Sequence, residues 1–179
     1  MTPEQKITTQ RLLDESSSAF LEIIHSIPDD RWKVKPAEDR WSVAEIAEHI
    51  VLVEAALLRK VRGLLATPPA SVVLGDPSTL DRLTEGVAGR QGRVQAPTTL
   101  LPTGEWTKAE VMAKFGAHRE AMELFVNTNT ESLDHHTAPN AFFGTLTAFD
   151  WLVYGPLHTT RHIHQLREIT GPGGAALTS

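Results

Sequence analysis

The sequence of 179 residues contains no cysteine. Disulfide bonds, iron–sulfur clusters, thiolate zinc sites and a nucleophilic cysteine are therefore excluded. An excess of basic residues is also missing, because 17 Lys and Arg stand against 22 Asp and Glu, for a formal net charge of −5. Without a basic stripe, neither a nucleic-acid partner nor an anionic lipid surface is expected.

Long apolar runs are missing as well. No run approaches the ~18 apolar residues that a membrane span needs, and residues 1–6 lack the basic and then apolar order of a signal peptide. We therefore expect no membrane partner and a cytoplasmic location. The length fits a single domain, residues 1–179, with enough chain to bury a substantial core.

Four stretches have apolar residues at every third or fourth position, a period that predicts amphipathic helices. They cover about residues 3–27, 42–66, 107–127 and 147–170. Capping-box patterns open the first three, with Thr or Ser before the helix and Gln or Glu three residues later. Four helices of this length without convincing strand alternation predict an all-α four-helix bundle.

The segment between the second and third helices, residues 67–106, is long and rich in Gly and Pro. Such a connection is usually a crossover, a lid or an oligomer contact, and here it predicts a bundle with a long crossover. Residues 78–81 could start one short helix within it, and residues 71–74 are the one short strand candidate. Another segment, residues 127–144, is expected to be a polar loop that exposes His135 and His136.

Two histidines in the last predicted helix, His158 and His162, are four residues apart. On a helix this spacing places both side chains on one face, here the apolar face, whereas His164 points away from it. A buried imidazole needs partners for its ring nitrogens. A shared divalent cation would satisfy both rings, because neutral imidazole is a common metal ligand. Core histidines bonded to carbonyl groups are the alternative.

A third histidine, His49, lies in the second predicted helix at the border of its apolar stripe. Taken alone it could be a half-exposed border residue. Together with His158 and His162 it could complete a site of three nitrogen ligands with one or two open positions, as in catalytic zinc sites. For the three to meet, the second and last helices must lie side by side and run antiparallel.

Three further residues are candidates for a catalytic role. Tyr154, one turn before His158, could bond a water or substrate, or it could simply pack. Glu45, one turn before His49, could be a general base, although its place in a capping box gives it a sufficient structural role. His118 lies in the apolar stripe of the third helix and could be a fourth ligand, a base or a core histidine.

Two neighbours of the histidines need a separate interpretation. Gln165, one turn after His162, could orient that imidazole or bond a nearby carbonyl. Glu48, beside His49, is expected to be solvated.

Residues 41–50, WSVAEIAEHI, resemble the W-S-x-x-E-I-x-x-H block of the DinB/YfiT-like superfamily of small metal-binding four-helix bundles. Residues 158–166 resemble its closing H-x-x-x-H-x-x-Q-L block, and the order and spacing of the helices match over nearly the whole chain. The resemblance implies that His49, His158 and His162 bind one divalent metal ion, typically zinc or nickel, with water completing the coordination.

The same resemblance implies two chemistries, since the superfamily includes metal-dependent hydrolases, thiol S-transferases and a thiol-dependent isomerase. A divalent ion can activate water or stabilise a thiolate, so the expected partner is a small-molecule substrate such as a low-molecular-weight thiol. The alternative is a non-catalytic small-ligand-binding or stress-linked bundle with a structural metal. Members often form dimers, and a homodimer is compatible with the apolar residues on several sides of the last helix.

Overall fold

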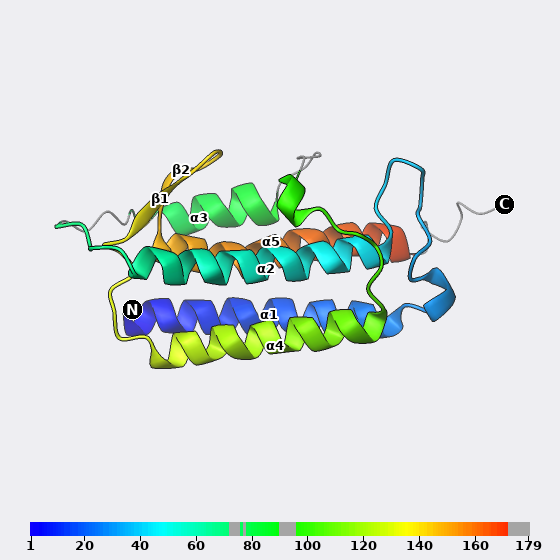
Figure 1. Ribbon diagram of the computed structural model, residues 1–179, viewed down its shortest axis with the longest axis horizontal. Helices are drawn as coiled ribbons and strands as arrows, with labels where there is room; N and C mark the ends of the chain where they lie inside the picture. The colour runs from blue at the N-terminus through cyan, green and yellow to red at the C-terminus, as the bar shows by residue number, and fades with distance from the viewer. Residues whose placement is uncertain (72–75, 77, 90–95, 172–179) are drawn as a thin grey trace.

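The computed structural model describes residues 1–71, 76, 78–89 and 96–171, and most of them are helical (Figure 1). The four long helices are α1 (Pro3–Ser26), α2 (Val43–Leu65), α4 (Lys108–Thr128) and α5 (Ala148–Thr170). Their bounds agree with the predicted ones to within one residue, and the mostly α class is confirmed. Among the described residues, none of the helices is long and apolar enough to cross a bilayer.

Each long helix begins at a capping box, in which the first side chain accepts the third helical N–H and the acid or amide accepts in return. The boxes join Thr2 to Gln5, Ser42 to Glu45, Thr107 to Glu110 and Thr147 to Asp150. The first three were predicted. The fourth was not, because it uses the shorter Asp where the usual pattern has Glu or Gln.

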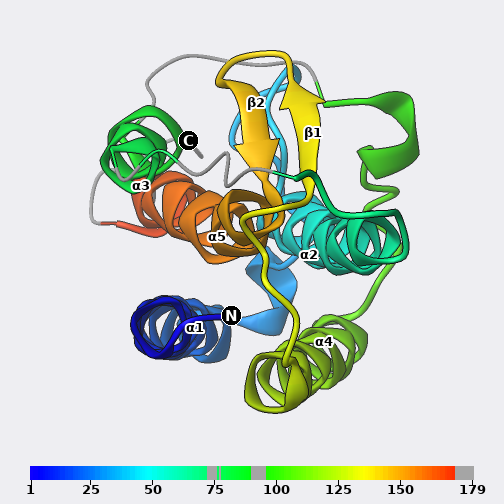
Figure 2. The same ribbon diagram turned by 90° about the vertical axis from the view of Figure 1, so that its left-hand side faces the viewer.

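The four long helices pack in a square when viewed from one end (Figure 2). Both α1 and α2 contact α4 and α5. Helices α1 and α5 run in one direction, and α2 and α4 run in the other (Figure 1). Since α2 and α4 are parallel, the chain between them must return along the whole length of the molecule, which is the predicted crossover.

The described elements of the crossover lie on the side of α2 and α5 that faces away from α1 and α4 (Figures 1 and 2). It contains the short helix α3 (Thr79–Leu83), the π-turn η2 (Thr84–Ala88) and the 3-10 turn η3 (Thr98–Leu100). Helix α3 and turn η2 pack on α5, and η3 packs on α2. The short helix confirms the prediction at residues 78–81. The strand candidate at 71–74 falls mostly on residues 72–74, which lie outside the described residues.

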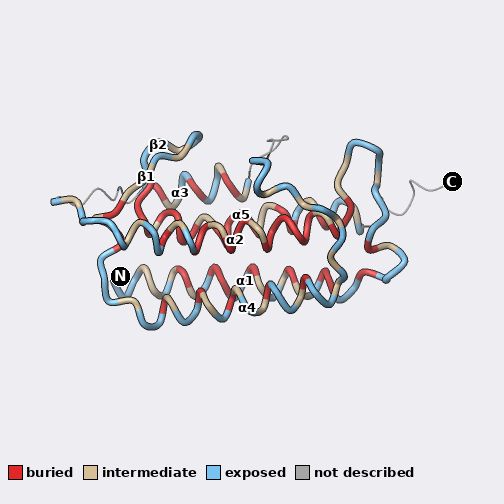
Figure 3. The backbone as a smooth tube through the Cα atoms, viewed as in Figure 1, coloured by how far each residue is buried: buried red, intermediate tan, exposed pale blue. Residues whose placement is uncertain are grey.

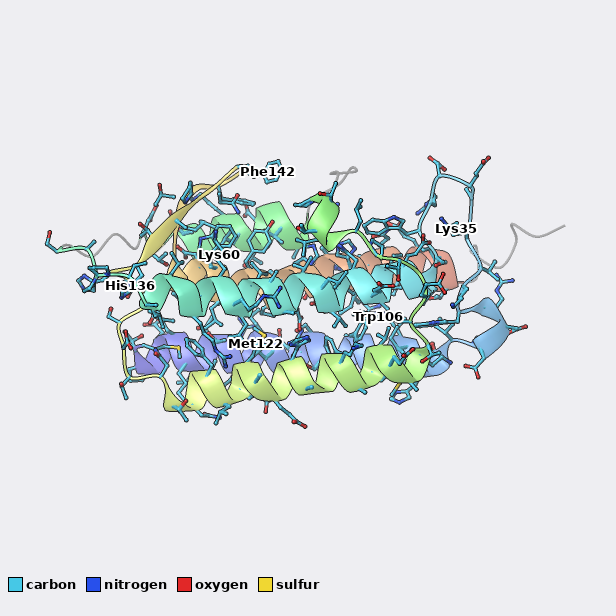
Figure 4. All side chains as sticks on the ribbon, viewed as in Figure 1. Lys35, Lys60, Trp106, Met122, His136 and Phe142 are labelled. Atoms are coloured by element: carbon cyan, nitrogen blue, oxygen red, sulfur yellow. The ribbon has the colours of Figure 1, made fainter. Side chains whose placement is uncertain are left out.

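Two apolar clusters fill the interior between the helices, where the buried positions face one another (Figure 3). One cluster, toward the start of α1, contains Leu13, Leu57 and Met122, and Figure 4 shows Met122 in the space between α2 and α4. The other contains Phe20 and Phe115, whose ring centroids are 4.4 Å apart.

The prediction of an exposed loop at residues 127–144 was wrong in part: residues 129–136 and 141–143 form no helix or strand, but the rest of the segment after α4 does. In this segment the chain forms an antiparallel hairpin of β1 (Thr137–Asn140) and β2 (Gly144–Thr147). A short 3-10 turn, η1 (Asp29–Arg31), follows α1. His136 is buried, and Nδ1 of His135 lies 2.9 Å from the carbonyl oxygen of Ala70. Four-residue strands carry too little alternation to be recognised from sequence.

Candidate metal centre

Three histidines from two helices converge on the outer face of the α2/α5 pair, beneath the crossover. The ring centroid of His49 lies 5.1 Å from that of His158 and 5.0 Å from that of His162, and the last two are 4.4 Å apart. One ring nitrogen from each residue lies within 4.8 Å of the others. Helices α2 and α5 run antiparallel, as this convergence requires.

Hydrogen bonds determine which nitrogen of two rings carries the proton. Nδ1 of His49 lies 2.8 Å from the carbonyl oxygen of Leu100, and Nδ1 of His162 lies 2.8 Å from Oε1 of Gln165. Both oxygens can only accept, so each Nδ1 carries the hydrogen and each Nε2 presents a lone pair. Of the two roles left open for Gln165, the structure thus contains the bond to the His162 ring.

The third ring, of His158, has its Nε2 at 3.2 Å from Nε2 of His162. This separation is close to the ~3.3 Å expected between two nitrogens that each lie about 2.0–2.1 Å from one tetrahedral ion. Nδ1 of His158 is buried and has no hydrogen-bond partner among the described residues. The three imidazoles thus form a set of neutral nitrogen donors that fits a divalent cation.

Burial keeps all three rings uncharged. It lowers the pKa of His162 to about 3, with the neighbouring His49 and Arg161 adding to the effect and the bond to Gln165 opposing it. Burial and the two neighbouring histidines lower the pKa of His158 well below its ordinary value. Burial likewise lowers the pKa of His49, although the Leu100 carbonyl opposes the change. Protons therefore compete weakly with a cation near neutral pH.

Aromatic rings border the three histidines. Tyr154 stacks on His158 with centroids 6.3 Å apart and an interplanar angle of 20°. On the other side, the ring of Trp41 lies 4.9 Å from that of His49. Tyr154, a catalytic candidate, thus has a ring contact with a histidine of this site.

Glu45 is occupied elsewhere. Its carboxylate accepts the Ser42 N–H at 2.7 Å and pairs with Nζ of Lys35 at 3.0 Å. Burial raises the pKa of Glu45, but these hydrogen bonds outweigh it and leave the pKa below its ordinary value. The residue is therefore an ionised helix cap in the structure.

His118 does not join the three histidines, since it projects from α4 and α4 packs on the opposite side of α2 from the crossover. It is half-buried, and burial lowers its pKa. The next residue, Arg119, occupies the buried position in its place, with 4% of its surface exposed.

The expectation that Glu48 is solvated was wrong. Only 1% of its surface is exposed, because the crossover covers this side of α2. Its carboxylate accepts hydrogen bonds from Thr103 and Gly104 of the crossover. Periodicity within α2 carries no information about a segment that packs on it from 55 residues away.

Comparisons with known proteins indicate the family of the chain. The model of the DinB superfamily matches residues 12–166, a range that contains all three histidines. The uncharacterized protein YuaE of Bacillus subtilis (strain 168) is 20% identical over 147 residues, which are 82% of this chain and 87% of that protein. No solved structure gives a significant match. Because the family model covers most of the chain, the protein belongs to the DinB superfamily.

Proposed function

We propose that the protein is a metal-dependent enzyme whose site is formed by His49, His158 and His162. The observation that carries the proposal is the convergence of three neutral imidazoles. In two of them Nδ1 is hydrogen-bonded to an oxygen, which leaves Nε2 unprotonated. We infer that the bound ion is zinc or nickel, since borderline divalent ions prefer imidazole nitrogen. The parallel α2 and α4 and the crossover support a four-helix bundle with α3 and the hairpin as additions.

An open coordination position supports catalysis over a purely structural role. No fourth His, Asp or Glu joins the three histidines among the described residues, and structural zinc sites are usually closed by four protein ligands. When bound, the divalent ion would supply charge that lowers the pKa of a water or thiol beside it. The protein's own part is to keep three rings neutral and oriented.

We infer that the nucleophile is a water or a low-molecular-weight thiol, which makes the enzyme a hydrolase or a thiol S-transferase. Glu45 is engaged as a helix cap, and Glu48 is engaged by the crossover. Because both carboxylates are already hydrogen-bonded, we infer that the metal site itself activates the nucleophile. Arg161 lies close enough to lower the pKa of all three histidines, and its charge favours an anionic ligand.

Metal analysis of protein purified without a histidine tag tests the proposal. We expect about one equivalent of zinc or nickel, and its loss in His49→Ala, His158→Ala and His162→Ala. His164→Ala is the matched control, because His164 is exposed on the opposite side of α5. The same proteins are then screened for ester hydrolysis and for transfer of a thiol to an electrophile.

Turnover that needs the metal, and that is lost in His49→Ala but kept in His164→Ala, would support the enzyme. Full metal content in His49→Ala would contradict the site. Stoichiometric metal without turnover on any thiol or ester would instead favour a binding protein with a structural metal.

A further inference from the structure

A short piece of the crossover, residues 98–104, lies across α2 next to the three histidines, and we call it the strap. It begins with the turn η3, whose Leu100 carbonyl oxygen bonds Nδ1 of His49. It ends at Gly104, which has φ +74°. A Cβ at Gly104 would lie 3.2 Å from Cγ of Glu45, so the strap approaches the helix too closely for a larger residue without displacement.

One carboxylate of α2 anchors the far end of the strap. Glu48 accepts the N–H of Thr103 at 3.0 Å, the hydroxyl of Thr103 at 2.9 Å and the N–H of Gly104 at 2.8 Å. Hydrogen bonds to an ionised acceptor are stronger than neutral ones. The next anchors follow further along the chain, where Lys33 donates to the Glu105 carbonyl and Trp32 donates to the Trp106 carbonyl.

The link between this anchor and the histidine is short and stiff. Only Leu101 and Pro102 separate Leu100 from Thr103. Pro102 has a fixed φ and restricts the residue before it to extended conformations, and Leu101 is extended, with φ −71° and ψ 132°. The position of Thr103 therefore largely determines where the Leu100 carbonyl points.

We propose that Glu48 is a positioning residue of the metal centre, which keeps the Leu100 carbonyl on Nδ1 of His49 by holding Thr103 and Gly104. The Nε2 lone pair of His49 is thereby kept directed at the ion. Two consecutive residues of α2 thus bond the same strap: Glu48 holds Thr103 and Gly104, and His49 bonds the Leu100 carbonyl. The inference rests on the proposed function for its effect on metal binding, but its effect on His49 exists without metal.

The test compares Glu48→Gln with the parent by ¹⁵N NMR of the histidine rings in metal-free protein and by zinc titration. Glutamine has the same shape but only one oxygen acceptor, and its NH₂ group faces the strap donors. We expect the parent His49 to carry its proton on Nδ1 alone and the variant to show a mixture of tautomers. Loss of such an orienting partner typically weakens metal binding by about 10–100-fold.

Three further variants keep the result interpretable. Thr103→Val removes one hydroxyl bond to Glu48 and should change both readouts in the same direction by a smaller amount; it decides the outcome if Glu48→Gln does not fold. Glu105→Gln changes an exposed carboxylate just past the strap and should change neither readout. Ser16→Ala removes a buried hydroxyl from another polar cluster and controls for general destabilisation.

An unchanged His49 tautomer in folded Glu48→Gln overturns the proposal. Unchanged zinc affinity beside a changed tautomer also overturns it, because the positioning would then have no consequence for the metal. If the parent binds no zinc, the proposed function fails, and the tautomer alone decides whether Glu48 positions His49.

Discussion

Two buried polar clusters lie on opposite faces of the same helix pair, α2 and α5. The outer cluster, beneath the crossover, is His49, His158 and His162. The inner cluster, between the four long helices, joins Glu54 of α2 and Thr159 of α5 to partners on α1 and α4. The inner cluster is fully buried, and in the outer one His49 and His162 are buried and His158 is partly exposed. The clusters also differ in how completely the protein satisfies their hydrogen-bonding groups.

The polar groups of the inner cluster hydrogen-bond one another. Glu54 accepts two hydrogen bonds from Arg119 and one from the hydroxyl of Thr159. The remaining NH₂ group of Arg119 donates to the Leu13 carbonyl and to Ser16, each at 3.0 Å. The cluster thus ties all four long helices together at the boundary between the two apolar clusters.

The outer cluster leaves bonding capacity unused. The Nε2 lone pair of His49 remains after its Nδ1 is bonded, and Nδ1 of His158 has no partner among the residues that the structure describes. Nε2 of His162 has only Nε2 of His158 beside it, at 3.2 Å. Unsatisfied buried polar atoms are costly. Leftover donor or acceptor capacity, more than polarity itself, is therefore what distinguishes a ligand site from a structural network in this protein.

The largest expected difference between the two clusters comes from removing the cation of the inner cluster, Arg119. Arg119→Met leaves Glu54 buried with only the Thr159 hydroxyl as a partner, and loss of one member of such an ion pair typically costs about 3–5 kcal/mol. Urea unfolding should show this loss, whereas zinc titration of the folded protein should not change. Glu54→Leu combined with Arg119→Met should regain most of the stability, and a loss below about 1 kcal/mol in the single variant would contradict the assignment.

The next largest effect is the pH dependence of the unfolding free energy, which the outer cluster should dominate. An unfolded histidine has a pKa near 6.5 and folded His162 one of about 3, so below pH 6.5 the unfolded state binds more protons and stability falls as pH falls. For His162 alone the loss between pH 7 and 5 is about 2 kcal/mol. Urea unfolding of metal-free protein measures it. His162→Asn should flatten the slope, and an equally steep slope in that variant would refute the cause.

Removing the partner of one outer ring has a smaller effect. Gln165→Leu deprives Nδ1 of His162 of its acceptor and should weaken zinc binding about 10-fold, or about 1.4 kcal/mol. Gln10→Leu is the matched control, because Gln10 bonds Asn127 on the exposed surface. Equal zinc affinities for the two variants, measured by competition with a chelator, would show that Gln165 does not orient the ring.

The smallest expected effect tests whether the two clusters are independent of each other. Thr159 is adjacent to His158 in sequence, but its hydroxyl bonds Glu54 on the inner face. Thr159→Val should cost about 1 kcal/mol in urea unfolding, as one neutral donor is lost, with zinc affinity unchanged. A clear loss of zinc affinity would show instead that the two clusters are coupled through α5.

Local patterns in the sequence determined the four long helices and most of the candidate site. Capping boxes and a 3–4 apolar period depend on residues a few positions apart, so they can be read without the fold. The same holds for His158 and His162, which share a face of α5 wherever that helix packs. His49 joined them through a block of residues that resembles the superfamily.

Only the tertiary structure decided which polar residues the core accepts. His118 falls within the apolar stripe that the sequence predicts, yet the adjacent Arg119 is the buried residue, because Glu54 and Ser16 from two other helices meet its guanidinium. Glu48 is buried because the strap crosses α2 there. Burial of a charge requires a partner distant in sequence, and that partner exists only once the helices and the crossover have packed.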